Sequence, residues 1–441
     1  MQDLLWWTSL NEGEKYLLSF LFIDRVGSTK DSEYYSKELV GTRANLFYKI
    51  VEDKIISFNG KLLEWHGDGN TAFFYVSKPE SLQEQAEILS KKAVDVALSI
   101  FSELVQHEEL KAYISIHFGL LSFKKEMGKI SSDELNIAGH VLKSCPEAGI
   151  LLHEDVISYS PDDTKQKFIY CGTTQRDLAP VFVYPKQRET LKKIDEFLPP
   201  DKDNYNAKNK HIKFTKEFYG KIIPRGLRQE KIVRIDLLDI YSPLKIRLQQ
   251  KESLINFNDK KDLPSPYSKI ETLSYLMSVP ETIIESRHSV ILGSPGAGKS
   301  TLIKWLALIY AQGKISVMER IGIEEELFPL PISIGHLSKI WIDNNKQIGM
   351  MDAIIKYYEI HNINISVFIK EIIETGKTII LFDGLDEVQS DADRRELSRW
   401  IESFITAFHK NRFVITSRIV GYTGISLANI DFFYIILKLI F

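Results

Sequence analysis

The segment Gly293–Thr301, GSPGAGKST, constrains the fold of this 441-residue chain more than any other. It fits the pattern G-x-x-x-x-G-K-[ST] and lies between an apolar strand-like run, VIL, and a helical run, TLIKWLALIY. A chain that turns this tightly from a buried strand into a helix needs glycines, since consecutive backbone N–H groups must point inward at phosphate oxygens. The segment therefore predicts a parallel sheet with a triphosphate-binding loop at one strand end.

Each residue type in this loop suits the binding of a nucleotide. The helix N-terminus adds partial positive charge, Lys299 supplies a cation for the β- and γ-phosphates, and the Ser300 hydroxyl ligates Mg²⁺. ATP or GTP with Mg²⁺ (or Mn²⁺) is the expected ligand. The predicted nucleotide-binding residues are Gly293, Ser294, Pro295, Gly296, Ala297, Gly298, Lys299, Ser300 and Thr301.

Two later apolar runs end in charged side chains that suit the same site. The run TIILFDGLDEV predicts a strand that ends at Asp383, a second magnesium ligand, followed by Asp386 and Glu387, which would orient or deprotonate the attacking water. The run RFVITSRIVGY predicts another strand, with Arg418 at the carboxyl end where open α/β sheets bind ligands. Arg418 is expected to sense or stabilise the γ-phosphate.

In this order, GSPGAGKST, PLPISI, LFDGLDEV and ITSRIVGY resemble the NACHT branch of the STAND-type signal-transducing NTPases. The resemblance covers roughly residues 241–422, and the glycine after the first acid of DGLDE is distinctive of that branch. It implies a RecA-like or AAA+-type domain that binds and slowly hydrolyses ATP or GTP as a switch. The tail DFFYIILKLIF differs from the family pattern, so we expect a NACHT domain that is truncated at its C-terminus.

The first half of the chain alternates between strand and helix patterns. The run LLSFLFI predicts a buried strand that ends at Asp24, and GDGN predicts the turn of a hairpin over residues 62–75. Apolar residues at helical spacing predict helices over 36–58 and 82–108, and a further strand is predicted at 112–120. This interleaving indicates an α/β layer fold.

Four segments of this half, FIDRVGSTK, GKLLEWHGDGNTAFF, IHFG and NIAGH, resemble in order the class III nucleotidyl cyclase domain. AGILLHEDV and DLAPVFVYPK extend the resemblance, which covers about residues 17–183. It implies a ferredoxin-like βαββαβ core that dimerises head to tail. It also implies that Asp24 and Asp68 hold the metal ions of a two-metal site, and that Asn136 orients the ribose.

Two positions depart from the cyclase pattern. His140 stands where the family has an arginine that steadies the transition-state phosphate, and histidine is often neutral near pH 7. Glu64 falls at the base-selecting position and matches guanylate cyclases, while Lys129, near the partner position, fits neither class. Two alternatives stay open: the domain converts an NTP to a cyclic nucleotide, or it only binds nucleotide or dimerises.

Composition sets the expected domain boundaries. Residues 186–216 are rich in Lys, Asp, Asn and Pro, which is typical of a solvated interdomain linker. We therefore expect a cyclase-like domain over 1–190, a polar linker over 191–217 and the NACHT domain over 218–441.

The bulk composition indicates which binding partners and which cellular compartment to expect. A formal net charge of -3 gives no sign of nucleic-acid or membrane binding, and no apolar run reaches the ~20 residues of a spanning helix. The two cysteines, Cys145 and Cys171, exclude a disulfide scaffold and a structural zinc site and fit a reducing cytoplasm. We expect a cytoplasmic protein that self-associates through both domains; a role in bacterial defence is implied by the family alone.

Overall fold

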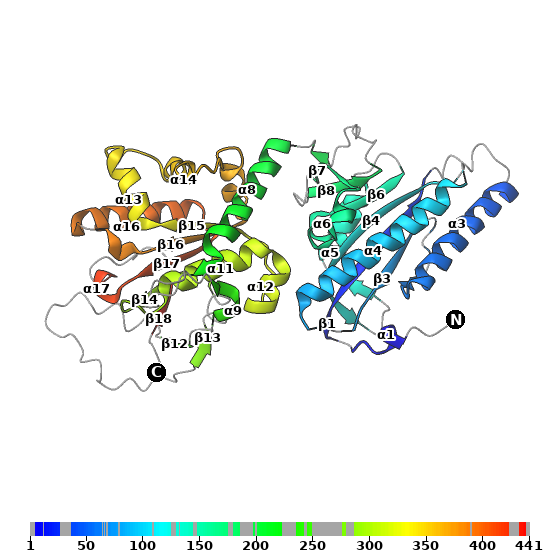
Figure 1. Cartoon of the computed structure of the whole chain (residues 1–441), viewed down its shortest axis with the longest axis horizontal. Coiled ribbons are helices and arrows are strands. Elements are labelled where there is room, and N and C mark those ends of the chain that lie inside the picture. Colours follow the sequence, from blue (N-terminus) through cyan, green and yellow to red (C-terminus); the bar gives the residue numbers. More distant parts are fainter. Residues whose placement is uncertain are drawn as a thin grey trace, which may run out of the picture. The chain divides into compact units, whose positions relative to one another are not determined.

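The computed structural model of the chain divides into two compact units, Met1–Asp201 and Lys202–Phe441 (Figure 1). Among the described helices, none combines the length and the apolar character needed to cross a bilayer. The structure describes residues 5–11, 13–26, 37–63, 65, 67, 69–77, 80–107, 110–124, 129–131, 133–143, 148–174, 180–185, 197–198, 201–222, 235–241, 245–248, 276–278, 286–388, 390–422 and 432–437.

The first part of the N-terminal unit is a βαββαβ layer. The strands lie in the order β2-β3-β1-β4, and each neighbouring pair is antiparallel. The two long helices, α3 and α4, pack against each other beside this sheet (Figure 1). The predicted ferredoxin-like core is confirmed. Its elements, after the short helix α1 (Leu5–Thr8), are β1 (Lys15–Arg25), α3 (Lys37–Ser57), β2 (Lys61–Leu62), β3 (Gly69–Phe74), α4 (Leu82–Val105) and β4 (Ala112–Lys124).

The sheet continues on the other side of β4. Strand β6 runs parallel to β4, and the order then continues β6-β8-β7-β9. Helix α5 packs on the sheet through Ala138, beside Leu18 and Phe20, and its Ala138 carbonyl accepts a 2.9 Å hydrogen bond from the Ser115 hydroxyl of β4. These elements are β5 (Lys129–Ser131), α5 (Asp133–Lys143), β6 (Gly149–His153), α6 (Glu154–Tyr159), α7 (Asp162–Lys165), β7 (Ile169–Thr174), β8 (Pro180–Tyr184) and β9 (Phe197–Leu198).

The polar segment between the two halves contains a helix that the sequence analysis missed. Residues 191–217 were expected to be a linker, but α8 spans Lys202–Tyr219 and belongs to the C-terminal unit. Its buried residues, Ala207, His211, Thr215 and Tyr219, recur every four positions. One face is therefore buried although the segment as a whole is strongly polar, and average composition concealed this narrow stripe.

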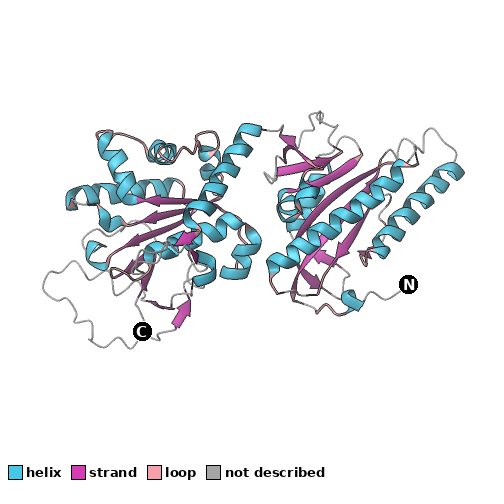
Figure 2. Ribbon diagram, in the orientation of Figure 1, coloured by secondary structure: helices cyan, strands magenta, loops and turns pink. Residues whose placement is uncertain are grey.

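The C-terminal unit is built on a seven-stranded sheet (Figure 2). The strand order is β13-β12-β18-β14-β17-β16-β15, in which the five strands from β18 to β15 are parallel and β12 and β13 extend the sheet antiparallel. The predicted parallel-sheet P-loop fold is confirmed. Its strands are β12 (Lys245–Leu248), β13 (Leu276–Ser278), β14 (His288–Gly293), β15 (Phe328–Ser333), β16 (Thr378–Asp383), β17 (Arg412–Ser417) and β18 (Phe433–Leu437), and β10 (Lys221–Ile222) pairs with β11 (Ile235–Asp236) outside it.

Helices cover both faces of this sheet because both faces of its strands are apolar. On β14, Val290 and Leu292 pack in one core cluster and Ile291 packs in the other, as expected for a parallel strand buried on both sides. The helices of this unit that follow α8 are α9 (Leu237–Ile240), α11 (Lys299–Gln312), α12 (Lys314–Ile321), α13 (Ile334–Asp343), α14 (Met350–Glu359), α15 (Ile369–Glu374), the 3-10 helix η4 (Leu385–Glu387), α16 (Asp391–Ala407) and α17 (Ile419–Tyr422).

The tail that departs from the family sequence pattern takes part in this sheet. Strand β18 pairs in parallel with β14, with Ile435 opposite Ile291, and Ile435 is fully buried. Its neighbour on the other side is β12, which runs antiparallel to it. The departure therefore lies in the sequence pattern, while the segment itself packs as a strand beside the P-loop strand.

Strand β15 forms one edge of the sheet, and side chains satisfy its outward backbone groups. The Pro329 carbonyl accepts a 2.8 Å hydrogen bond from His211 Nε2 of α8, and the Pro331 carbonyl accepts a 2.9 Å bond from the Tyr358 hydroxyl. The Ser333 N–H donates to the Tyr357 hydroxyl at 3.2 Å. The outward backbone groups of residues 329, 331 and 333 alternate along the strand with the backbone groups that face β16.

Candidate functional site

The P-loop connects β14 to α11 through two glycines in the left-handed region. Gly296 has φ +79° and Gly298, the residue that caps α11, has φ +88°. A Cβ built on Gly296 would meet nothing within 4 Å, so the requirement for glycine here comes from the backbone conformation and not from space. The first N–H groups of α11 have no partners within the helix and are available to an anion.

Lys299 lies in the loop that it is expected to serve. Its Nζ donates to the carbonyl of Gly293 at 2.8 Å and to that of Ser294 at 3.1 Å. Phosphate oxygens would compete well for this ammonium, because they carry full negative charge whereas the two carbonyl oxygens carry only partial charge. Ser300 is exposed in the first turn of α11, where its hydroxyl can reach a metal ion. These residues fit a triphosphate with Mg²⁺.

Asp383 ends β16 and is held by a buried threonine of the neighbouring strand. Thr416 Oγ1 donates to Asp383 Oδ1 at 2.6 Å and accepts a hydrogen bond from the Gly384 N–H at 2.9 Å. Thr416 itself is 0% exposed. The sequence analysis missed this residue, although Phe382 pairs with Ile415, so that the residues following each lie side by side.

Arg418 follows β17, as predicted, and forms an ion pair. Its Nε lies 2.9 Å from Asp386 Oδ2, and its backbone N–H donates to Asp386 Oδ1 at 2.8 Å. The Arg418 side chain is 57% exposed, while that of Asp386 is only 10% exposed. Both oxygens of Asp386 are therefore engaged by Arg418.

The Glu387 side chain passes close to two glycines. A Cβ on Gly384 would meet Glu387 Cδ at 2.7 Å, and a Cβ on Gly335 would meet Glu387 Oε2 at 2.9 Å. Gly384 also has φ +83°, so the backbone conformation requires the glycine of DGLDE, and a Cβ there would displace the Glu387 side chain. Burial raises the pKa of Glu387, and the carboxylates of Asp383 and Asp386 raise it further. A raised pKa suits a group that must accept a proton near neutral pH.

The charged residues at these strand ends affect one another's pKa values. Burial lowers the pKa of Lys299, while the carboxylates of Asp386 and Asp383 act in the opposite direction. A cavity of about 180 Å³ adjoins Asp383 and is also lined by Tyr219 of α8 and Tyr357 of α14. Helix α8 therefore lines a cavity next to Asp383, one of the predicted nucleotide-site residues. The roles of these residues in catalysis stay predictions.

The structure describes fewer of the predicted N-terminal site residues. Asp24 lies at the end of β1 and pairs with Gly69 of β3, and a Cβ on Gly69 would lie 3.5 Å from Asp24 Oδ1. Glu64 and Asp68 lie outside the described residues. Asn136 and His140 lie on α5, but the described part of the structure does not include their side chains. The metal and ribose contacts of this unit stay predictions.

Comparison with solved structures finds cyclases for the N-terminal part. The adenylyl cyclase CyaB from P. aeruginosa is 15% identical, with 41% of this chain and 100% of that chain covered and a TM-score of 0.31. The guanylyl cyclase domain of the RhoGC fusion protein from the aquatic fungus Blastocladiella emersonii is 16% identical, with 40% of this chain and 98% of that chain covered and a TM-score of 0.32. A bacterial light-regulated adenylyl cyclase is 19% identical, with 43% of this chain and 56% of that chain covered and a TM-score of 0.33. The match thus spans about half of the light-regulated cyclase.

Comparison by sequence finds a family match for part of the C-terminal unit. No curated protein matches the chain. The family model of the NACHT domain matches residues 287–428, which include the P-loop, the acids after β16 and the arginine after β17. The chain therefore carries a NACHT domain at residues 287–428.

Proposed function

We propose that the C-terminal unit is a nucleotide-controlled switch that binds ATP or GTP with Mg²⁺ and hydrolyses it slowly. The observation that supports this most directly is the gathering of Lys299, Asp383, Glu387 and Arg418 at the carboxyl ends of adjacent parallel strands. Ligands of open α/β sheets bind at this edge. The NACHT match covers all four residues.

Each residue has a defined part in this proposal. Lys299 and the first N–H groups of α11 would hold the phosphates, and Ser300 and Asp383 would hold Mg²⁺, which neutralises phosphate charge when it is bound. Glu387 would accept the proton of the attacking water. Arg418 would turn from Asp386 toward the γ-phosphate, so that the ion pair forms in one nucleotide state and breaks in the other.

Removing the lysine tests the proposal. Lys299→Ala in the full chain should weaken ATP and GTP binding by about 10–100-fold, because a hydrogen bond to a charged group is worth about 1.5–3 kcal/mol. Lys370→Ala is the matched control, since Lys370 lies on α15 with a 75% exposed side chain. Equilibrium binding of labelled nucleotide in the presence of Mg²⁺ measures the affinity of both variants. Equal affinity of a folded Lys299→Ala protein and the control would refute the assignment.

We further propose that the N-terminal unit binds a nucleoside triphosphate through Asp24 and Asp68 and converts it to a cyclic nucleotide when nucleotide binding by the NACHT domain promotes self-association. The support is the pairing of Asp24 with Gly69, the residue that follows Asp68 in the sequence. Two carboxylates that share metal ions can activate a hydroxyl and stabilise a triphosphate leaving group. A role of this output in bacterial defence signalling is part of the same proposal.

The assay is production of cyclic nucleotides by the full chain from ATP, GTP, CTP and UTP with Mn²⁺. Asp24→Asn should abolish the product, and His140→Arg should increase it, since a guanidinium holds phosphate more firmly than imidazole. If neither the unchanged chain nor His140→Arg makes a cyclic product, the catalytic proposal fails. The alternative, a unit that only binds nucleotide or dimerises, then replaces it.

A further inference from the structure

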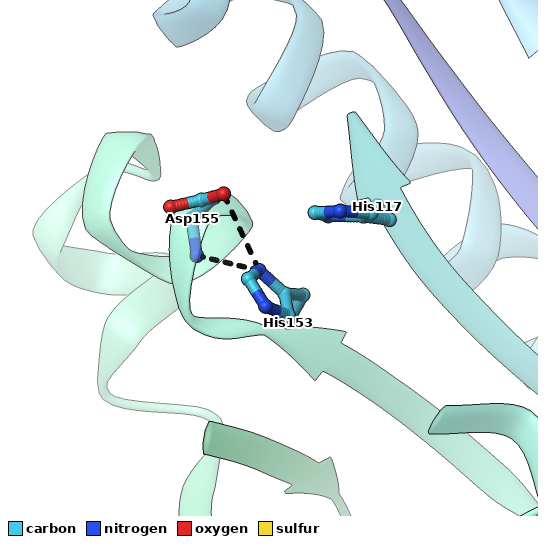
Figure 3. Close-up of side chains that lie close together, drawn as sticks. All are labelled: His117, His153 and Asp155. Atoms are coloured by element: carbon cyan, nitrogen blue, oxygen red, sulfur yellow. Dashed lines mark hydrogen bonds and ion pairs between the residues drawn. The ribbon is translucent and has the colours of Figure 1, made fainter. Parts of the chain in front are cut away.

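Three side chains of the N-terminal unit, carried by neighbouring elements, converge at one point (Figure 3). They are His117 of β4, His153 at the end of β6 and Asp155 at the start of α6. The potential ligand atoms, one from each side chain, all lie within 4.8 Å of one another. His117 is 0% exposed and His153 is 5% exposed, so this cluster is built into the core and is not a surface collection of charges.

The local backbone holds two of these groups in place. His153 caps α6: its Nδ1 accepts the Asp155 N–H at 3.2 Å and lies 3.5 Å from Asp155 Oδ2 (Figure 3). The His117 and His153 rings lie with their centroids 4.2 Å apart and their planes at 55°, so the rings are tilted and do not stack face to face. The ring of Phe20 lies edge-on to that of His117, with the two ring centroids 5.6 Å apart.

The donor set and its spacing suit a transition-metal ion. Two ligands bound to one tetrahedral zinc at 2.0–2.1 Å lie about 3.4 Å apart, so side-chain shifts of about 1 Å would bring all three groups into coordination. Imidazole nitrogens favour Zn²⁺ over Mg²⁺, which prefers oxygen ligands.

We propose that His117, His153 and Asp155 bind one Zn²⁺ ion, which joins strands β4 and β6 to helix α6. The earlier exclusion of structural zinc considered only cysteine ligands and does not apply to this set. The ion would stabilise the N-terminal unit around the strand on which α5 packs, since Ser115 of β4, two residues before His117, bonds the Ala138 carbonyl. This site is separate from the proposed nucleotide and cyclase chemistry.

The test is zinc binding by the metal-free full chain without nucleotide and with excess Mg²⁺. We expect one tightly bound Zn²⁺, and an absorption band in the visible range when Co²⁺ replaces it. Loss of a partner outside the metal's own ligands commonly weakens metal binding by 10–100-fold, so loss of a direct ligand in Asp155→Asn should exceed about 100-fold. Asp162→Asn and His107→Ala, which change exposed residues of the same unit, should bind as the unchanged chain does.

A second variant and a third control make the outcome decisive. His153→Gln should lose the ion as Asp155→Asn does, with circular dichroism showing that both stay folded. Asp24→Asn should keep it, which separates this site from the proposed carboxylate pair. The proposal is overturned if the unchanged chain binds no zinc, if folded Asp155→Asn and His153→Gln bind it with unchanged affinity, or if Asp24→Asn abolishes binding.

Discussion

Replacing Thr416 by valine should damage both the stability and the metal dependence of the NACHT domain. The valine has the same shape but lacks the hydroxyl that donates to Asp383 and accepts the Gly384 N–H. A hydrogen bond to a charged group is worth about 1.5–3 kcal/mol, and a buried N–H left without a partner costs about 1–3 kcal/mol. Because Asp383 is partly exposed and water recovers some of the loss, we expect about 3 kcal/mol in total.

The control is Thr416→Ser, which keeps the hydroxyl and removes one methyl group, at a cost of about 1 kcal/mol. Calorimetry of the full chain should show the transition that responds to Mg²⁺-nucleotide lowered by about 6–12 °C in Thr416→Val, and by much less in Thr416→Ser. Thr416→Val should also bind nucleotide with a weaker dependence on Mg²⁺, because Asp383 is no longer held in position. Equal melting temperatures and equal Mg²⁺ dependence in the two variants would show that this hydroxyl does not organise the site.

Two further predictions concern ionisable groups of the same unit. Glu387→Gln should slow hydrolysis by about 10²–10⁴-fold with little change in nucleotide affinity, since it removes a proton acceptor and spares the phosphate contacts. Single-turnover kinetics, with Glu374→Gln as the control, tests this prediction. An unchanged hydrolysis rate in Glu387→Gln would contradict the role. Burial lowers the pKa of His211 to about 4, against 6.5 in the unfolded chain. The neutral ring therefore stabilises the fold above pH 6.5, and about 3 kcal/mol of that stability should be lost as the pH falls from 6.5 to 4. Urea unfolding should show that His211→Gln loses less stability than the unchanged chain over this pH range. If the stability of the two proteins changes with pH in parallel, the assignment to His211 is wrong.

Local sequence patterns predicted much of the fold. A strand that runs into a glycine-rich turn and then into an apolar helix specifies β14 and α11 from neighbouring residues alone. The strands that end at Asp383 and Ser417 were predicted for the same reason, because each is a short apolar run that stops at a polar residue. Since the carboxyl ends of parallel strands lie at one edge, their following charges were expected to meet, and they do.

The parts that were missed depend on contacts between distant segments. Thr416 and Asp383 are 33 residues apart, and nothing in the sequence near either residue shows the hydrogen bond between them. His211 forms a hydrogen bond with a carbonyl 118 positions away, which the neighbouring sequence does not reveal. The polar composition of α8 therefore led to the prediction of a linker. The His117 and His153 cluster likewise forms only when β4 and β6 pair in parallel, with Ile116 opposite Leu152.

The edge strand β15 has a consequence for how copies of this unit can associate. A sheet edge recruits another strand only if it presents N–H and C=O groups in turn. On β15 the outward positions 329 and 331 are prolines, which have no N–H, and their carbonyls already accept bonds from His211 and Tyr358. The next outward N–H, at Ser333, is bonded to Tyr357. Strand addition, the usual route to β-aggregation, is therefore blocked at this edge, and copies that assemble must do so through other surfaces.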